Sequence, residues 1–280
     1  MTNPDTSDQL PTVASILSVS DPDEFAQAVE NLRKIDAATL RSTFSSLLID
    51  PDSPVALGIT RAIGILNLPD AIDLLIGLAE EPGKWFSHED RKAIQSAAVE
   101  SLGMLRDPRA LDVLMDILKN SHNPDLELES VKAIALIAHP DSVCPLLESM
   151  NANPPLALSA AGALVQIGGD EALYGLMSAL RHDSEMVRSA SVWALGEMRD
   201  ERAIDSLIRI GSKSDTLSRL DVVWAMGRIG GLTAFIALGE ISKTDPDNIV
   251  RLEAGKALQS CTTSGKSSDS HETDEAQQVE

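Results

Sequence analysis

The sequence is poor in aromatic residues and cysteine, and it has no long apolar run. Aromatic side chains make up only 3% of the 280 residues, so a core here must be built from aliphatic side chains. Two cysteines, Cys144 and Cys261, are too few for a disulfide framework or a zinc site. No stretch approaches the roughly eighteen apolar residues of a membrane span, and residues 1–20 lack the features of a signal peptide. We therefore expect a cytoplasmic protein without membrane insertion.

Basic residues are also scarce. The chain has 23 lysines and arginines against 43 acidic residues, which gives a formal net charge of −20. Nucleic-acid backbones and anionic membranes would be repelled, so we expect neither as the main partner. The charge favours a protein partner with a basic patch. The alternative is that the acidic residues only keep the surface solvated.

A triplet of the form small–apolar–small recurs about every 31 positions. It occurs at Ala62–Gly64, Ser101–Gly103, Ala133–Ala135, Ala163–Val165, Ala194–Gly196, Ala225–Gly227 and, more loosely, Ala257–Gln259. A leucine follows the last residue of each of the first six triplets at a fixed distance, as Leu75, Leu114, Leu146, Leu176, Leu207 and Leu238. Repeats of this period are typical of solenoids, in which each unit buries its apolar face by stacking on its neighbours.

Each repeat has the pattern of two helices joined by a polar turn. In the fifth repeat, apolar residues follow helical spacing over 184–198 and again over 203–210. Proline or glycine in the turn is expected to end the first helix, and aspartate to cap the second. No segment alternates with a period of two. The sequence thus predicts an all-α fold, an α-solenoid or superhelix of about seven stacked antiparallel helix pairs.

The composition also divides the chain along its length. We expect a flexible lead-in over 1–20, the solenoid over 21–260, and a disordered acidic tail over 261–280. The first repeat, 21–50, is irregular. The interval between the first two triplets is longer than the others because of an insertion at 80–92. Insertions in repeat proteins map to loops on one face, often the binding face, so Trp85 and Phe86 are candidate contact residues.

The fifth repeat resembles HEAT-like repeats of the phycobilisome-lyase type. The resemblance rests on Asp183–Leu207, which has an acidic turn, Val187-Arg188, an Ala-Leu-Gly triplet and a closing leucine helix, and it covers roughly 55–260. It implies second helices lining a concave face. It also implies an alternative function, because this repeat type serves bilin lyases as well as scaffolds. A bilin lyase subunit or bilin-handling chaperone for phycobiliproteins would hold an open-chain tetrapyrrole as a transient ligand.

Comparison of the repeats suggests contact residues on the first helices. The position three residues before the last residue of each triplet is mostly charged, which indicates that it faces water. Trp193 and Trp224 occupy this position in neighbouring repeats. We expect them to be exposed and to form a contact site, since large aromatic side chains anchor interfaces. The alternative is that the two indoles pack on each other or on Leu220.

The second helices suggest a further surface. Aligned outward positions hold Asp112, Asp116, Cys144, Tyr174 and Asp205, and a basic or amphipathic partner would lie along them. The alternative is a merely solvated face. Cys144 itself is expected to be a buried or half-buried, inert thiol, because no histidine is aligned beside it.

Three arginines share an aligned position, Arg188, Arg219 and Arg251. We expect them to form a structural ladder with carboxylates of adjacent repeats. Signals for catalysis are few. The His-Glu steps at 88–89 and 271–272 are expected to lie in a loop and in the tail, short of what a metal site on the helices needs. We predict no catalytic residues, no metal and no cofactor, and hence a non-catalytic scaffold or adaptor that binds protein.

Overall fold

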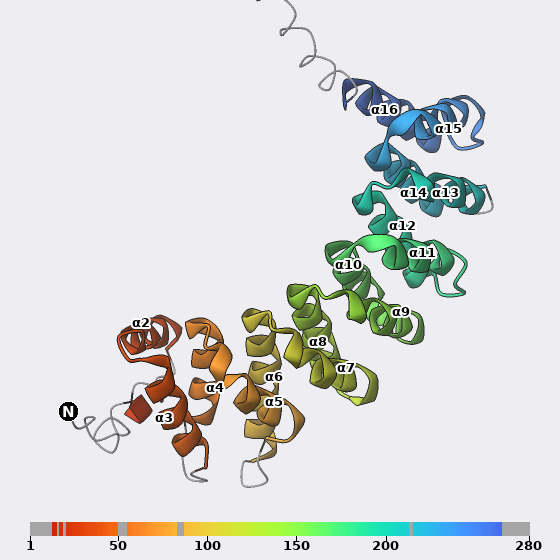
Figure 1. Ribbon diagram of the computed structural model, residues 1–280. Helices are drawn as coiled ribbons and strands as arrows, with labels where there is room; N and C mark the ends of the chain where they lie inside the picture. The colour runs from red at the N-terminus through yellow and green to blue at the C-terminus, as the bar shows by residue number, and fades with distance from the viewer. Residues whose placement is uncertain are drawn as a thin grey trace, which may run out of the picture. The chain divides into compact units, whose positions relative to one another are not determined.

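The computed structural model describes residues 13–15, 17–18, 21–49, 55–82, 87–212 and 215–264. Within these ranges the chain forms α-helices and short 3-10 turns and contains no strand. The helices follow one another as consecutive pairs (Figure 1), which confirms the predicted all-α solenoid fold. The chain divides into two compact units, 1–145 and 146–280, and the boundary falls inside one helix.

Each repeat contributes a first and a second helix. The first helices are α2 (Pro22–Leu32), α4 (Ala56–Leu66), α6 (His88–Leu105), α8 (Pro124–Ile137), α10 (Ala157–Ile167), α12 (Glu185–Met198) and α14 (Thr216–Ile229). The second helices are α3 (Ala37–Ile49), α5 (Ile72–Glu80), α7 (Leu111–Asn120), α9 (Val143–Ala152), α11 (Gly169–Ala179), α13 (Ile204–Gly211) and α15 (Gly231–Thr244). The last helix is α16 (Asn248–Ser264). Within each unit, successive first helices pack directly on one another.

The recurring triplet is explained by this packing of first helices. A Cβ atom on Gly103 would lie 2.8 Å from Cα of Ala133, and one on Gly196 would lie 3.0 Å from Cα of Ala225. The last residue of one triplet therefore faces the first residue of the next triplet in the stack. Both must be small for the helix backbones to approach this closely, while the middle residue, such as Leu102, is fully buried.

The first helices end differently from the prediction. Four of them end at a residue other than glycine in the left-handed region, namely Asn67, Arg106, Ala138 and Arg199, with φ of 52° or 53°. Only α10 and α14 end at glycine, at Gly168 and Gly230. The expected prolines come slightly later, where Pro69, Pro108 and Pro140 begin 3-10 turns that lead into second helices. The geometry of the turn is thus kept although its residue types vary.

The expected boundaries also need correction. Part of the predicted flexible lead-in is packed, because Val13 and Leu17 are helical and only 2% and 3% exposed. A Cβ on Gly58 of α4 would collide with the carbonyl oxygen of Leu17. At the other end, α16 continues to Ser264, beyond the predicted end of the solenoid at 260. The remaining tail, 265–280, lies outside the described residues.

The insertion is partly helical. His88 and Glu89, predicted to lie in a loop, form the first turn of α6, which Ser87 caps by accepting a hydrogen bond from the Asp90 backbone N–H. The candidate contact residues Trp85 and Phe86 lie outside the described residues. No helix in the described part of the chain is long and apolar enough to cross a membrane.

Candidate functional site

Two tryptophans of the second unit lie over glycines of the preceding first helix. Trp224 on α14 is 40% exposed, as expected, whereas Trp193 on α12 is half-buried rather than exposed. The Trp193 ring atoms Cη2 and Cζ3 lie 3.9 Å from where a Cβ on Gly162 would be, and Cζ3 of Trp224 lies 2.7 Å from the corresponding point on Gly196. The missing side chains at Gly162 and Gly196 therefore make room for the two indoles.

Both indoles line one groove, which we call the tryptophan groove. Its volume is about 540 Å³, and it is bounded by α10, α12, α14 and the 3-10 turn at Pro154–Leu156. Its walls are mainly apolar and include Leu158 and Met186, which are 61% and 55% exposed. Asp221 is the one charged residue that lines it. Exposed apolar side chains that gather in one patch, unlike scattered ones, are typical of interaction sites.

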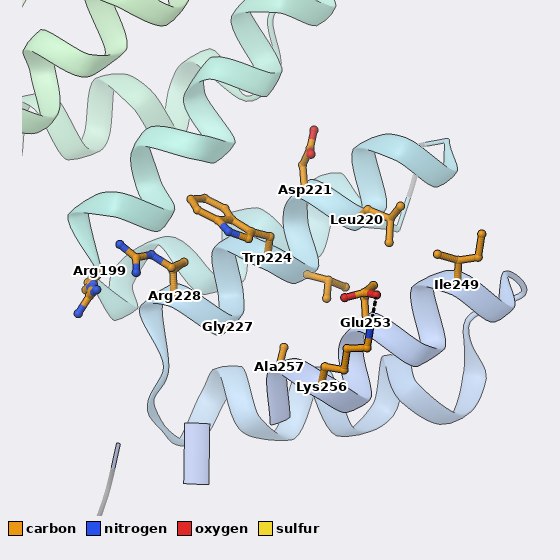
Figure 2. Close-up of a pocket in the computed structure, with 11 residues that line it drawn as sticks. Arg199, Leu220, Asp221, Trp224, Gly227, Arg228, Ile249, Glu253, Lys256 and Ala257 are labelled. Carbon is orange, nitrogen blue, oxygen red and sulfur yellow. Dashed lines mark hydrogen bonds and ion pairs between the residues drawn. The ribbon is translucent and has the colours of Figure 1, made fainter. Parts of the chain in front are cut away.

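A second groove of about 790 Å³ lies between α14 and α16, and Trp224 and Asp221 line it too. We call it the α14–α16 groove. Figure 2 shows Leu220 and Ile249 at one end of this groove and Arg199 and Arg228 at the other. Trp224 therefore lies between the apolar end and the basic end of this groove.

Two of the three basic residues that line the α14–α16 groove, Arg228 and Lys256, have acidic partners in the fold. Arg228 Nη2 donates to Glu197 Oε2 at 2.8 Å, and Lys256 Nζ lies 2.7 Å from Glu253 Oε1. The guanidinium carbon of Arg228 also lies 5.9 Å from the centre of the Trp224 ring, a cation–π distance. Two of the positive charges in this groove are thus largely neutralised within the chain.

Asp221 differs from these groups, because no basic residue among the described ones pairs with it. It precedes Trp224 by one helical turn on α14, so both side chains share a face. Although Asp221 is an exposed residue, partial burial of its carboxyl raises its pKa, and the negative charges of Asp215 and Glu185 raise it further. The tryptophan groove therefore carries an uncompensated negative charge beside two indoles.

The second helices present the residues expected of them. Asp112 and Asp116 on α7 are exposed in the first unit, and Asp205 on α13 is exposed in the second. Tyr174 on α11 is 53% exposed. Cys144 on α9 is also exposed, so the expectation of a buried or half-buried thiol was wrong. Its place in the aligned repeats indicated exposure correctly, and the general tendency of cysteine to be buried did not hold here.

The ring of Tyr174 already contacts a cation of the same chain, Arg202. The guanidinium carbon of Arg202 lies 5.6 Å from the centre of the Tyr174 ring, and Arg202 Nη2 donates to Asp170 Oδ1 at 2.9 Å. Asp200 caps the 3-10 turn Glu201–Ala203 and also accepts hydrogen bonds from the Arg202 side chain. These bonds lower the pKa of the Asp200 carboxyl. A basic partner would therefore compete with Arg202 at this place.

The expected arginine ladder is only partly present. Arg219 forms two hydrogen bonds to the carboxylate of Asp245, at 3.0 and 3.2 Å, in the loop before α16. Arg188 and Arg251 instead donate to backbone carbonyls of the loops before their own helices, at His182, Asp183, Asp245 and Pro246. The correction has a local cause, since an arginine in the first turn of a helix reaches the preceding loop more easily than a neighbouring repeat.

Several residues of the grooves were not predicted from the sequence, among them Leu158, Met186, Asp221 and Ile249. The signal was available in positions seven and ten before the last residue of each triplet. These hold Leu158, Met186, Ile249 and Leu252 in the second unit, but leucine also occupies them in the first unit, at Leu57 and Leu128, so the signal is weak. Exposed apolar side chains also occur on other helices, including Leu232 and Ile236 on α15, but the first helices of the second unit combine them with the two tryptophans.

Comparison with known proteins gives distant relatives. The chain is 24% identical over 274 residues to deoxyhypusine hydroxylase of Mus musculus, covering 75% of this chain and 88% of that protein. No group of three or more histidine, cysteine, aspartate or glutamate side chains in the described ranges is placed to hold a metal ion.

Two solved structures are also similar. Human deoxyhypusine hydroxylase in complex with glycerol has a TM-score of 0.41 and 19% identity, with 92% of this chain and 97% of that one covered. The complex of CpcE and CpcF, the phycocyanin lyase of Nostoc sp., has a TM-score of 0.45 and 15% identity, with 79% and 94% covered. The HEAT-repeat family model matches residues 83–135, 141–219 and 175–259. Since these matches span more than half of the chain, the protein belongs to the HEAT-repeat family.

Proposed function

We propose that this chain is a scaffold that binds another protein through the first helices of its second unit. The observation that carries the proposal is that Trp193 and Trp224 line a groove together with the exposed apolar side chains Leu158 and Met186. Indoles in partly desolvated grooves are frequent anchors of protein interfaces, and the surrounding apolar residues exclude water from the contact.

We choose the first-helix face over the second-helix face because the two faces differ in how far their side chains are already bound within the chain. Tyr174 is engaged with Arg202, and Arg202 with Asp170. By contrast, Leu158, Met186 and Ile249 are each more than half exposed. Covering them would gain roughly 25 cal/mol per Å² of apolar surface removed from water. In the tryptophan groove such apolar side chains adjoin two indoles, and for this reason we propose the first-helix face as the contact surface.

The alternative is a bilin-handling protein, as the resemblance to phycobilisome-lyase repeats suggests. The observation that favours it is that Asp221 lines the tryptophan groove together with both indoles. A carboxylate at this place would pair with pyrrole nitrogens, and the indoles would cover the faces of an open-chain tetrapyrrole.

A pull-down from the native cell extract tests the proposal. The wild type is compared with Trp193→Ala/Trp224→Ala and with Leu232→Ala/Ile236→Ala. The last variant removes side chains that are 73% and 61% exposed on α15, away from both grooves, and controls for loss of surface apolarity. We expect a protein retained by the wild type and by the control to be lost by the tryptophan variant.

Two other outcomes are informative. Retention of the same proteins by all three forms would rule out the tryptophan groove as the contact surface. Recovery of coloured phycobiliprotein, or a change in bilin absorbance when the pure protein is mixed with free bilin, would favour the bilin-handling alternative. Circular dichroism of each variant shows whether the helical fold is retained.

A further inference from the structure

Asp221 has an unusual setting, because it is a carboxylate in a groove that is otherwise uncharged. The remaining lining residues are prolines, small residues and large apolar or aromatic side chains. Glu185 and Asp215 lie near enough to add to the negative potential at Asp221. The chain itself thus supplies three acidic groups to this place and, among the described residues, no basic side chain paired with Asp221.

In the neighbouring α14–α16 groove, other charged side chains are paired within the chain. In the α14–α16 groove, Arg228 is paired with Glu197 and Lys256 with Glu253. Asp221 lines both grooves, and among the described residues no basic side chain pairs with it.

The indoles provide a second attraction for a cation. Arg228 lies over the Trp224 ring, and Figure 2 shows Asp221 one turn away on the same helix. Within the described residues, no lysine or arginine lies over the ring of Trp193. An indole face attracts a cation through its quadrupole, and most strongly where water is partly excluded. A carboxylate and an indole face on one groove suit an arginine or lysine side chain.

We propose that the tryptophan groove binds an arginine or lysine side chain of a partner protein, held between the indole of Trp193 and the carboxylate of Asp221. The proposal rests on the proposed scaffold function and names the chemistry of its partner. Apolar residues flanking that cation would contact Leu158 and Met186, which a free amine would leave uncovered. The occupant is therefore an amphipathic protein segment, consistent with the charge of −20 on this chain.

Labelled synthetic peptides test this proposal by fluorescence anisotropy. One probe consists of leucine and alanine with a central arginine. In its matched partner, citrulline, which is uncharged and nearly isosteric, replaces that arginine. We expect the wild type to bind the arginine peptide about tenfold more tightly than the citrulline peptide. The variant Asp221→Asn should lose most of this preference and Trp193→Ala should reduce it.

The control is Asp205→Asn, which removes one exposed negative charge from α13, away from the groove. It should keep the full preference for the arginine peptide. Equal preference in Asp221→Asn and Asp205→Asn would overturn the proposal, because the attraction would then belong to the net charge alone. Failure of the wild type to bind either peptide would overturn it as well. Equally tight binding of both peptides that is lost in Trp193→Ala would overturn the cation site and leave the scaffold function standing.

Discussion

The six-membered ring of Trp224 lies directly on Gly196 of the preceding first helix, with Cζ3 only 2.7 Å from the place of a Cβ atom. The equivalent pair, Trp193 and Gly162, leaves 3.9 Å, an ordinary van der Waals distance. Trp224 therefore leaves no room for a side chain at the position of Gly196, whereas Trp193 leaves room for one at the position of Gly162.

This difference predicts opposite effects of the same substitution. Gly196→Ala should lower the free energy of unfolding by about 1–3 kcal/mol, because the indole and Ala225 must move away. Gly162→Ala should raise it by about 0.5–1 kcal/mol through helix propensity. Urea unfolding followed by circular dichroism measures both. Equal effects of the two substitutions would mean that the indoles crowd Gly162 and Gly196 to the same degree.

The ion pair between Arg219 and Asp245 should stabilise the fold more than an exposed ion pair does. Its side chains are only 18% and 9% exposed. Arg219→Met keeps the apolar stem but leaves the Asp245 carboxylate buried without its cation, so we expect a loss of about 3 kcal/mol. Glu30→Gln, which breaks a pair whose side chains are 51% and 63% exposed, should cost less than about 0.5 kcal/mol. Thermal unfolding of both variants is the measurement, and a loss no larger than that of Glu30→Gln would show that the buried pair contributes little.

The left-handed conformation of Ala138 should be improved by glycine. Its φ of 53° costs an alanine about 1–2 kcal/mol, more than the extra chain entropy of glycine in the unfolded state. We expect Ala138→Gly to raise the free energy of unfolding by about 0.5 kcal/mol. Ala93→Gly, within α6, should lower it by about 0.5–1 kcal/mol. If Ala138→Gly instead lowered the free energy of unfolding, the left-handed conformation of Ala138 would not be strained.

The stability contributed by Asp221 should depend on pH. Its pKa is raised above the ordinary value of 3.8, so the folded state binds the proton more tightly than the unfolded state. Its contribution is therefore largest at pH values below 3.8 and is lost as the pH rises through the raised pKa. At pH 7 Asp221→Asn should raise the free energy of unfolding by about 0.5 kcal/mol after allowance for solvent screening.

The measurement is the difference in Tm between wild type and Asp221→Asn at pH 7 and at pH 4, with Asp205→Asn as the control for loss of one charge. The advantage of Asp221→Asn should shrink at the lower pH. An advantage that grows as the pH falls would mean that the pKa of Asp221 is lowered, not raised, in the folded state.

Much of the fold could be predicted from the sequence because the triplet repeats. Packing of Gly103 on Ala133 requires small residues at fixed intervals, and that requirement is visible without coordinates. The exposure of Tyr174 and Asp205 could be predicted for the same reason, since aligned repeats place them at equivalent outward positions. The ends of the first helices were harder, because a backbone conformation such as that of Ala138 is imposed by the turn and not by its side chain.

The sequence by itself determined the repeat, the helix pairs and the two tryptophans as neighbours on successive first helices, because periodicity and helical spacing are local properties of the chain. Only the tertiary structure decided that each indole lies on a glycine, that Arg228 is neutralised by Glu197, and that Asp221 is left without a cation beside the indoles. These relationships join residues about one repeat apart through side-chain rotamers and burial, which a pattern of residue types does not specify.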